Sequence, residues 1–336
     1  MKIAYILYPE VVISNKSNGI RSQAETWAEL LRTKGHEVDL VNNWGDYNWK
    51  NYDLIHLFGG GTWISSISKK IYPYNNNIVW SPIIDPSLRM GFYTMFNIIR
   101  CGQLLFHYHW RYSDFIDSIP YIKSFFVRSE FEGKHLIKAF RVPENKLSLV
   151  PLSYSDSCIS YQPSKKEPFC LHISSIYQKR KNVIRLIKAA KKYNFKLVLA
   201  GNKGAQKQFQ PVLDAIGDAD NIEVLGFISE EKKIDLYKRA KVFVLPSLSE
   251  GVGIVALDAA YYGCEIAITN IPGPKEYYNG KCLEVNPYDI DSIGSSIKKT
   301  LEGEVSYQPE LSAHVMKYYS PDAITKKLEE QYYKLL

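Results

Sequence analysis

A stretch that runs from an apolar strand through a glycine loop into a helix carries two acidic residues. It spans residues 245–263 and reads LPSLSEGVGIVALDAAYYG, with Glu250 in the loop and Asp258 eight positions later. Gly251 and Gly253 stand directly before the helical pattern, so a ligand can closely approach backbone N–H groups there. First-turn N–H groups lack intrahelical partners, and the helix dipole favours anions at that end. The pattern predicts a phosphate-binding site.

The two acids allow two interpretations. The carboxylate of Glu250 is itself an anion, so it suits a hydroxyl-rich or cationic group beside a phosphate rather than the phosphate itself. A nucleotide sugar offers such hydroxyls. The alternative is that Glu250 is a solvated loop acid and Asp258 a surface helix acid, as most Asp and Glu residues are. The surrounding sequence has to decide between them.

Apolar strand patterns alternate with helical patterns along the chain, which predicts an α/β fold built on parallel sheets. Strands are expected at residues 2–8, 38–41, 52–58, 78–80, 125–127 and 147–150, and then at 169–173, 196–200, 222–225, 242–245 and 265–269. Helices are expected at residues 22–34, 129–140, 182–193, 209–216, 230–240, 290–301 and 321–336. The glycine-loop signatures in both halves are typical of Rossmann-like units.

A Ser- and Pro-rich stretch at residues 153–168 has no apolar period and indicates a linker between two domains. We expect one Rossmann-like domain at residues 1–155 and a second at 165–315, with a C-terminal helix at about 316–336 that packs back on the first. In such sheets ligands bind beyond the carboxyl ends of the strands. Two arrays that face each other across a cleft would place the ligand between them.

Composition narrows the class of function. The net charge of +7 favours anionic partners, but there is no dense Lys/Arg run, so nucleic acid is not an expected partner. The five cysteines show no CxxC pair, which indicates a reducing compartment and no zinc site. No apolar run is long enough to span a bilayer, and the run at residues 3–8 is too short for a signal-peptide core. These features predict a cytoplasmic protein.

A resemblance to a known family covers most of the second half. The chain carries HISSIYQKRKNVIRLIKA at 172–189, KLVLAGNKG at 196–204, LPSLSEGVGIVALDAAYYG at 245–263 and LEVNPYDIDSI at 283–293. This ordered series resembles the large family of retaining glycosyltransferases with the GT-B fold, the glycosyl transferases group 1 type, whose signature is an acid-x7-acid (EX7E) motif. The family includes bacterial α-mannosyl-, α-glucosyl- and α-galactosyltransferases. The first half is similar more loosely, through SNGIRSQAETWAELLRTKGHEVDLV, YDLIHLFGG and the FVRSEF and LSLVP segments.

The resemblance implies roles for the loop residues. Lys181 and Arg180 would contact the diphosphate of the donor, where negative charge develops as the nucleotide leaves. Glu250 would bind hydroxyls of the donor sugar and stabilise its oxocarbenium-like centre. Among the other donor-binding positions, Asp258 would accept hydrogen bonds from the ribose. The donor-binding set implied in this way is Gly19, Phe227, Gly251, Val252, Gly253, Ile254, Val255 and Asp258.

The chain departs from the family pattern in three places. Asp258 stands where the family usually has Glu, and the Arg that often precedes the diphosphate Lys is replaced within SSIYQK, so that Arg180 can substitute. Many members carry a His after the fourth strand, where this chain reads WSPIIDPS. Asp85 can take part of that role on the acceptor side, and His107 and His109 are further candidates, although each histidine can equally be a packed or surface residue.

The resulting expectation is a retaining, metal-independent glycosyltransferase that needs no cofactor. It would move a hexosyl unit from a UDP- or GDP-sugar to a glycan or lipid-linked acceptor, in the synthesis of a cell-surface polysaccharide or glycoconjugate. The departing phosphate oxygen would serve as the base, as proposed for the family. The aromatic and basic residues 90–112 can dock an anionic membrane, which would place the protein peripherally on the inner face of the cell membrane; equally, they can form a core helix pair with a solvated basic face. The alternatives are an inactive binding subunit with this fold and a sugar-nucleotide epimerase.

Overall fold

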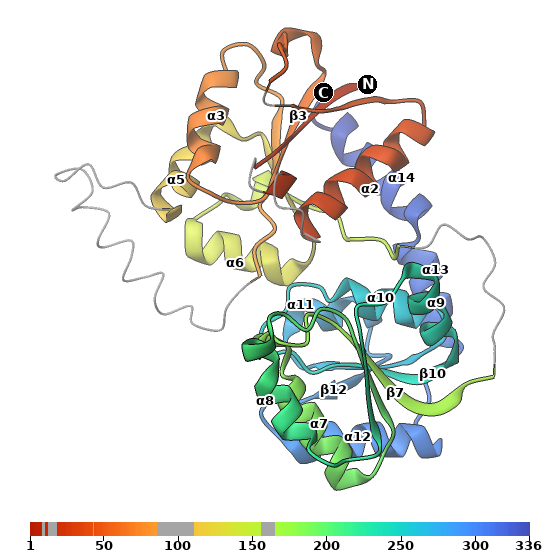
Figure 1. Cartoon of the computed structure of the whole chain (residues 1–336). Helices are drawn as coiled ribbons and strands as arrows, with labels where there is room; N and C mark the ends of the chain where they lie inside the picture. Colours follow the sequence, from red (N-terminus) through yellow and green to blue (C-terminus); the bar gives the residue numbers. More distant parts are fainter. Residues whose placement is uncertain (9–10, 13–18, 43, 86–110, 156–164) are drawn as a thin grey trace. The chain divides into compact units, whose positions relative to one another are not determined.

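The computed structural model describes residues 1–8, 11–12, 19–42, 44–85, 111–155 and 165–336. The chain divides into two compact units, Met1–Leu152 with Asp322–Leu336, and Ser153–Pro321 (Figure 1). Each unit holds a six-stranded sheet whose strand pairs are parallel. The predicted α/β class with two Rossmann-like units is confirmed.

The first sheet has the strand order β2-β1-β3-β4-β5-β6. Its strands are β1 (Lys2–Leu7), β2 (Glu37–Leu40), β3 (Leu54–Phe58), β4 (Ile78–Ser81), β5 (Ser124–Val127) and β6 (Leu147–Leu149). Its helices are α2 (Gly19–Thr33), α3 (Trp63–Ile71), α5 (Arg111–Ser118), α6 (Glu130–Phe140) and α14 (Pro321–Tyr333). Figure 1 shows α2 and α14 on one side of this sheet and α3 and α5 on the other.

Alternate residues along the strands of the first sheet point to opposite faces, and helices cover both of these faces. Ala4, Ile6, Ile55 and Leu57 pack in the apolar cluster that includes residues of α3, α5 and α6. The residues between them face the other way, so that Tyr5, for example, contacts the rings of His56 and Phe58. Because both faces of the central strands are covered, β1 and β3 consist mostly of apolar residues, as buried parallel strands require.

A hydrogen-bonded chain of buried side chains connects α14 to this sheet. The hydroxyl of Tyr332 lies 2.9 Å from that of Tyr5 and 2.6 Å from His56 Nδ1, and His56 Nε2 lies 2.8 Å from Ser81 Oγ. Burial lowers the pKa of His56 well below its ordinary value, so the ring is neutral. The last helix of the chain is therefore an integral part of the first unit.

The second sheet has the order β12-β11-β10-β7-β8-β9. Its strands are β7 (Glu167–Ile173), β8 (Leu197–Ala200), β9 (Ile222–Gly226), β10 (Ala240–Leu245), β11 (Glu265–Thr269) and β12 (Leu283–Val285). Its helices are α7 (Val183–Tyr193), α8 (Gln206–Ile216), α9 (Glu230–Arg239), α10 (Ile254–Tyr261), α11 (Pro272–Lys275), α12 (Ile290–Glu302) and α13 (Glu310–Tyr319). Residues of α7, α8 and α12 form one apolar core with this sheet.

The returning helix α14 begins at Pro321, where the helix expected at 321–336 begins, rather than at the approximate domain bound of 316. Residues up to Tyr319 form α13, which belongs to the second unit, and α14 starts at Pro321. Ser320 is extended between them, as the residue before a proline usually is. Pro321 then occupies the first helical position, where its missing N–H costs nothing. The proline therefore ends one helix and begins the next.

Candidate functional site

The carboxyl end of β10 leads into the loop at residues 246–253 and then into α10. Gly253 is the N-cap of α10 and has a φ of 73°, in the left-handed region that favours glycine. A Cβ there would lie 2.8 Å from Leu245 Cδ2, so a larger residue would require the Leu245 side chain to shift. This glycine therefore sets the direction in which the first turn of α10 presents its N–H groups.

Glu250 and Lys181 form a buried ion pair within this loop system. Lys181 Nζ donates to Glu250 Oε2, and Ser247 Oγ donates to the same oxygen over 3.0 Å. All three side chains are buried. Neither the acid nor the cation is thus a solvated surface group, which excludes the interpretation of Glu250 as an exposed loop acid. A buried ion pair of this kind contributes little to stability, so a stabilising role alone does not explain why it is present.

The two loops that carry the pair are tied together by backbone and amide contacts. The N–H of Leu248 donates to the carbonyl of Arg180 over 2.7 Å. The side-chain amide of Asn182 donates to the carbonyls of Pro246, at 2.9 Å, and Pro287, at 2.6 Å. Asn182 itself has a φ of 61°, which asparagine tolerates better than most residues. Its amide therefore joins the loops after β10 and β12 to the start of α7.

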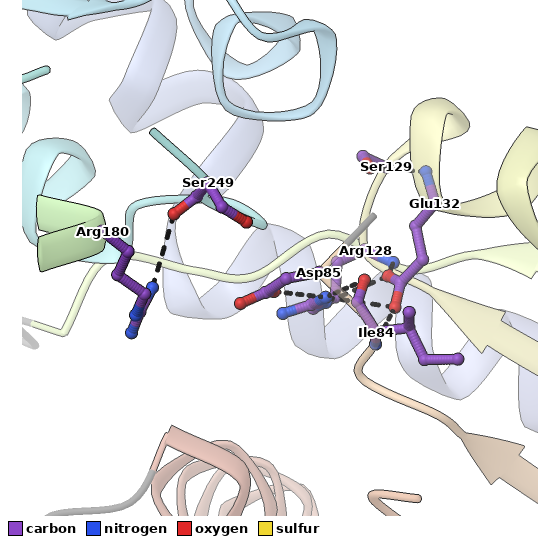
Figure 2. Close-up of polar contacts among 7 residues, drawn as sticks. All are labelled: Ile84, Asp85, Arg128, Ser129, Glu132, Arg180 and Ser249. Carbon is purple, nitrogen blue, oxygen red and sulfur yellow. Dashed lines mark hydrogen bonds and ion pairs between the residues drawn. The ribbon is translucent and has the colours of Figure 1, made fainter. Parts of the chain in front are cut away.

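Arg180 lies at the rim of the same loop system and is exposed. Its Nε donates to the side chain of Gln178 over 3.0 Å, and its Nη1 lies 3.5 Å from the carbonyl of Ser249 (Figure 2). The second contact is long and therefore weak, so the guanidinium is held mainly by its bond to Gln178. Lys181 is thus the buried cation of these loops and Arg180 the exposed one.

His172 is buried within β7, the strand that precedes the loop of Lys181. Its Nδ1 donates to the carbonyl of Val244 over 2.8 Å, so Nε2 accepts from the hydroxyl of Ser174 at 2.7 Å. Burial lowers the pKa of His172 to about 4, and the charge of Lys181 acts in the same direction. The ring is therefore neutral near pH 7 and adds no positive charge. The sequence prediction did not include it.

Asp258 is buried in α10, with 5% of its surface exposed. Its Oδ1 accepts from the N–H of Ser155 over 2.7 Å, and its Oδ2 accepts from the Ser155 hydroxyl over 3.2 Å. Burial raises the pKa of this carboxyl to about 6, although the bonds from Ser155 favour the ionised form. The acid expected to bind ribose hydroxyls thus holds a serine hydroxyl, and its predicted role stays a prediction.

The remaining predicted donor positions of the second unit lie at the same edge of the sheet. Phe227 follows β9 and is 87% exposed, next to Gly226 at a φ of 74°. Gly251 and Val252 are buried in the loop before α10, and Ile254 and Val255 form its first turn. Strand ends of a parallel sheet gather at one edge, so the residues after β7, β9 and β10 share that edge.

Gly19 and Asp85 belong to the first unit. Gly19 begins α2, and a Cβ there meets no described atom within 4 Å, so the described residues around it leave room for a side chain. Asp85 follows β4, and its Oδ1 lies 3.3 Å from Nη2 of Arg128, which in turn pairs with Glu132 (Figure 2). The sequence prediction missed this pair. His107 and His109 lie outside the described residues.

Within the described part of the chain, no group of three or more His, Cys, Asp or Glu side chains is arranged to hold a metal ion. Among the same residues, no helix is long and apolar enough to cross a membrane. A cavity of about 700 Å³ lies elsewhere in the first unit, with a lining that includes Lys69, Tyr121 and Arg141. Its lining contains none of the predicted site residues.

Comparisons with known proteins agree with this geometry. A family model described as "Glycosyl transferases group 1" matches residues 155–321, almost the whole second unit. The O-antigen chain mannosyltransferase B of Escherichia coli is 25% identical over 206 residues, 56% of this chain and 54% of that protein. The O-antigen chain mannosyltransferase RfbU of Salmonella typhimurium is 29% identical over 167 residues, 48% of this chain and 46% of that one. The chain thus spans about half the length of these relatives.

Solved structures extend the likeness to both units. Anabaena HepE, crystallised with UDP and glucose, superimposes with a TM-score of 0.74 at 13% identity and covers 99% of this chain and 100% of its own. At such low identity the superposition shows a shared fold and nothing about the reaction. The fold shared along the whole chain is the GT-B fold.

Proposed function

Because this chain belongs, through residues 155–321, to the glycosyl transferases group 1 family, we propose that it is a retaining hexosyltransferase. The donor is a UDP- or GDP-sugar, and the acceptor is a hydroxyl of a glycan or of a lipid-linked sugar. The reaction uses no metal ion and no cofactor. The product contributes to a cell-surface polysaccharide or glycoconjugate. The names of the two O-antigen mannosyltransferases make mannose the first sugar to test.

The buried Lys181–Glu250 pair is the observation that carries this proposal. A nucleoside diphosphate that enters the site brings two phosphates that compete with Glu250 for Lys181. The N–H groups of the first turn of α10 and the guanidinium of Arg180 add further donors. Glu250, released from the lysine, can then accept hydrogen bonds from hydroxyls of the sugar. Exchange of one anion for another keeps the buried cation paired throughout.

The reaction breaks the bond between the anomeric carbon and the phosphate oxygen and forms one between that carbon and the acceptor oxygen. The acceptor hydroxyl attacks on the face that the phosphate leaves, which retains configuration, and its proton passes to the departing phosphate oxygen. Lys181 and the helix N–H groups stabilise the charge on the nucleotide as it develops. Glu250 stabilises the positive charge on the sugar ring.

The direct test is a transfer assay with a panel of donors. Purified protein is incubated with UDP-glucose, UDP-galactose, UDP-N-acetylglucosamine and GDP-mannose, each with a mixture of short glycan acceptors, in the presence and absence of EDTA. We expect one donor to give a glycosylated product with retained configuration, at a rate that EDTA leaves unchanged. Interconversion of two nucleotide sugars without transfer would identify an epimerase. Nucleotide binding with neither reaction would identify an inactive subunit.

The place of action is part of the same proposal. The net charge of +7 favours an anionic surface, and a lipid-linked acceptor is held at a membrane. We therefore propose a cytoplasmic protein that binds peripherally to the inner face of the cell membrane through residues 90–112, most of which lie outside the described residues. Co-sedimentation should rise with the fraction of anionic lipid in vesicles and fall with added salt. Binding that ignores both variables contradicts the proposal.

A further inference from the structure

The loop that follows β4 in the first unit is held in an uncommon conformation. Ile83 has a φ of 54°, in the left-handed region that a β-branched residue rarely adopts. A backbone conformation of this kind persists only where the surroundings over-determine it, and it is concentrated at functional sites. The side chains that hold this loop in place therefore indicate which part of it has a functional role.

Glu132 fixes the loop from the first turn of α6. Ser129 caps that helix by accepting from the N–H of Glu132 over 3.1 Å, and the sequence Ser-x-x-Glu has the spacing of a capping box. Glu132 is 1% exposed, and its side chain does not accept from the N-cap N–H as in a capping box. It accepts from the N–H of Ile84, at 2.7 Å, and from the N–H of Arg128, at 2.9 Å. One buried carboxylate thus joins the ends of β4 and β5, which are adjacent strands.

Arg128 completes the connection from the β4 loop to solvent. Its Nε and Nη2 donate to the two oxygens of Glu132, at 3.0 and 3.1 Å. Nη2 also donates to the carbonyl of Ile84, at 2.9 Å, and lies 3.3 Å from Asp85 Oδ1 (Figure 2). Both members of the pair are buried, whereas the side chain of Asp85 is 42% exposed. The network therefore ends in one carboxylate that a ligand can reach.

We infer that Arg128 and Glu132 are positioning residues that hold Asp85 at the carboxyl edge of the first sheet to receive a hydroxyl of the acceptor sugar. The inference rests on the proposed function and names the acceptor-binding carboxylate and the residues that aim it. The cluster holds one positive and two negative side chains, so it favours a hydroxyl donor over a phosphate or carboxylate of the acceptor. The edge itself is where ligands of such sheets bind.

The experiment uses the full chain, the donor identified in the panel and a neutral glycan acceptor. Asp85→Ala and Arg128→Lys are compared with wild type for two rates, transfer to the acceptor and slow hydrolysis of the donor without acceptor. Lysine keeps the charge of Arg128 but loses the planar fork that contacts Glu132 and the loop together. Glu132→Gln tests the buried carboxylate, and Glu130→Gln, on the same helical turn with a side chain 66% exposed, is its matched control.

We expect kcat/KM for the acceptor to fall roughly tenfold or more in Asp85→Ala, Arg128→Lys and Glu132→Gln, because a hydrogen bond to a charged group is lost or misaligned. Donor KM and acceptor-free hydrolysis should stay within about twofold of wild type, and Glu130→Gln should behave as wild type. Asp85→Glu should recover part of the activity, since it keeps the carboxylate.

Two results overturn the inference. In the first, transfer and acceptor-free hydrolysis fall together in Asp85→Ala and Arg128→Lys, which indicates a structural role only. In the second, the variants fold and kcat/KM for the acceptor is unchanged. A wild-type protein that neither hydrolyses nor transfers any donor contradicts the proposed function instead, and the inference that rests on it falls with it. Thermal melts of each variant separate loss of fold from loss of positioning.

Discussion

Lys181 and Glu250 stand 69 positions apart in the chain, each in a loop after a different strand. The sequence motif identified both residues and assigned them separate roles, one toward a diphosphate and one toward a sugar. It could not predict that they pair with each other, because that contact depends on how β7 and β10 are placed side by side in the sheet. His172, Ser155 and Arg128 were missed for the same reason, because their contacts with Val244, Asp258 and Asp85 join residues that are far apart in the sequence.

Replacement of Lys181 by alanine tests the diphosphate role. We expect affinity for free UDP or GDP to fall roughly tenfold or more, because a charge-assisted contact in a buried site is lost. Isothermal titration calorimetry measures this directly. Lys192→Ala is the matched control, since its ion pair with Asp291 has side chains that are 58% and 55% exposed. Equal affinities for the two variants would contradict the role of Lys181.

Asp258 predicts a pH dependence of stability. Burial raises the pKa of its carboxyl from 3.8 to about 6, so the folded protein holds this proton more tightly than the unfolded one. The contribution of the group to stability therefore falls as pH rises from about 4 to about 6, by at most about 3 kcal/mol. The free energy of unfolding of Asp258→Asn should gain on that of wild type across this range in urea titrations. Parallel curves would show that the carboxyl is not perturbed.

The pH dependence of stability that His172 predicts runs in the opposite direction from that of Asp258. Burial lowers the pKa of its ring from 6.5 to about 4, so the unfolded protein binds this proton more readily. Stability from this group is present above about pH 6.5 and is lost as pH falls toward 4. In His172→Gln the acid-side loss should be smaller than in wild type, when urea unfolding is followed at pH 7.5 and pH 4.5. An identical acid-side loss in both proteins would contradict a neutral, buried ring.

At the scale of elements, the sequence predicted the strands of both sheets well where they are continuous apolar runs. It missed α3, whose nine residues include two lysines among several serines, and α13, because short polar-rich helices show only a weak period. Their apolar residues are nevertheless buried, Ile64 and Ile71 in α3 and Leu311 and Val315 in α13. Tertiary packing stabilises these helices, and packing is not visible in a local window.

A substitution at the junction between β10 and α10 should lower both the free energy of unfolding and the affinity for nucleotide. Gly253→Ala places a side chain at a φ of 73° and within 2.8 Å of Leu245, so we expect a loss of about 1–3 kcal/mol in unfolding free energy and weaker nucleotide binding. Gly19→Ala is the control for unfolding free energy alone, because its Cβ meets no described atom within 4 Å and Gly19 is itself a predicted donor-binding position. Chemical denaturation compares the two. Similar losses in both variants would mean that the αL turn is not needed.

At the scale of the whole molecule, the order of strand and helix patterns predicted two Rossmann-like units and a tail that returns to the first. The tail is fixed to the first unit by hydrogen bonds among Tyr332, Tyr5 and His56, residues that are far apart in sequence. Apolar periodicity shows that a helix exists, but it carries no information about which buried hydroxyl meets which ring. The acceptor-side candidates His107 and His109 stay predictions, because they lie outside the described residues.

The tail contact gives a prediction for the whole chain. Tyr332→Phe leaves His56 Nδ1 and the Tyr5 hydroxyl without their partner in a buried position, so unfolding free energy should fall by about 1–3 kcal/mol. Tyr333→Phe is the control, since the neighbouring tyrosine is 58% exposed. Denaturant titration followed by tryptophan fluorescence compares the two variants. An equal, small effect of both substitutions would show that the buried hydrogen bonds of Tyr332 contribute nothing to the free energy of unfolding.

The proposal that the loops after β7 and β10 bind and activate a nucleotide sugar is tested most directly by Glu250→Gln. The measurement is the rate of sugar transfer from the donor identified in the panel, with Glu223→Gln as control, since Glu223 lies in the same unit with a side chain 52% exposed. Glu250→Gln should fold, bind the free nucleotide, and transfer at least roughly a hundredfold more slowly, because a charge that stabilises the transition state is removed. Transfer at the wild-type rate by folded Glu250→Gln would contradict the account.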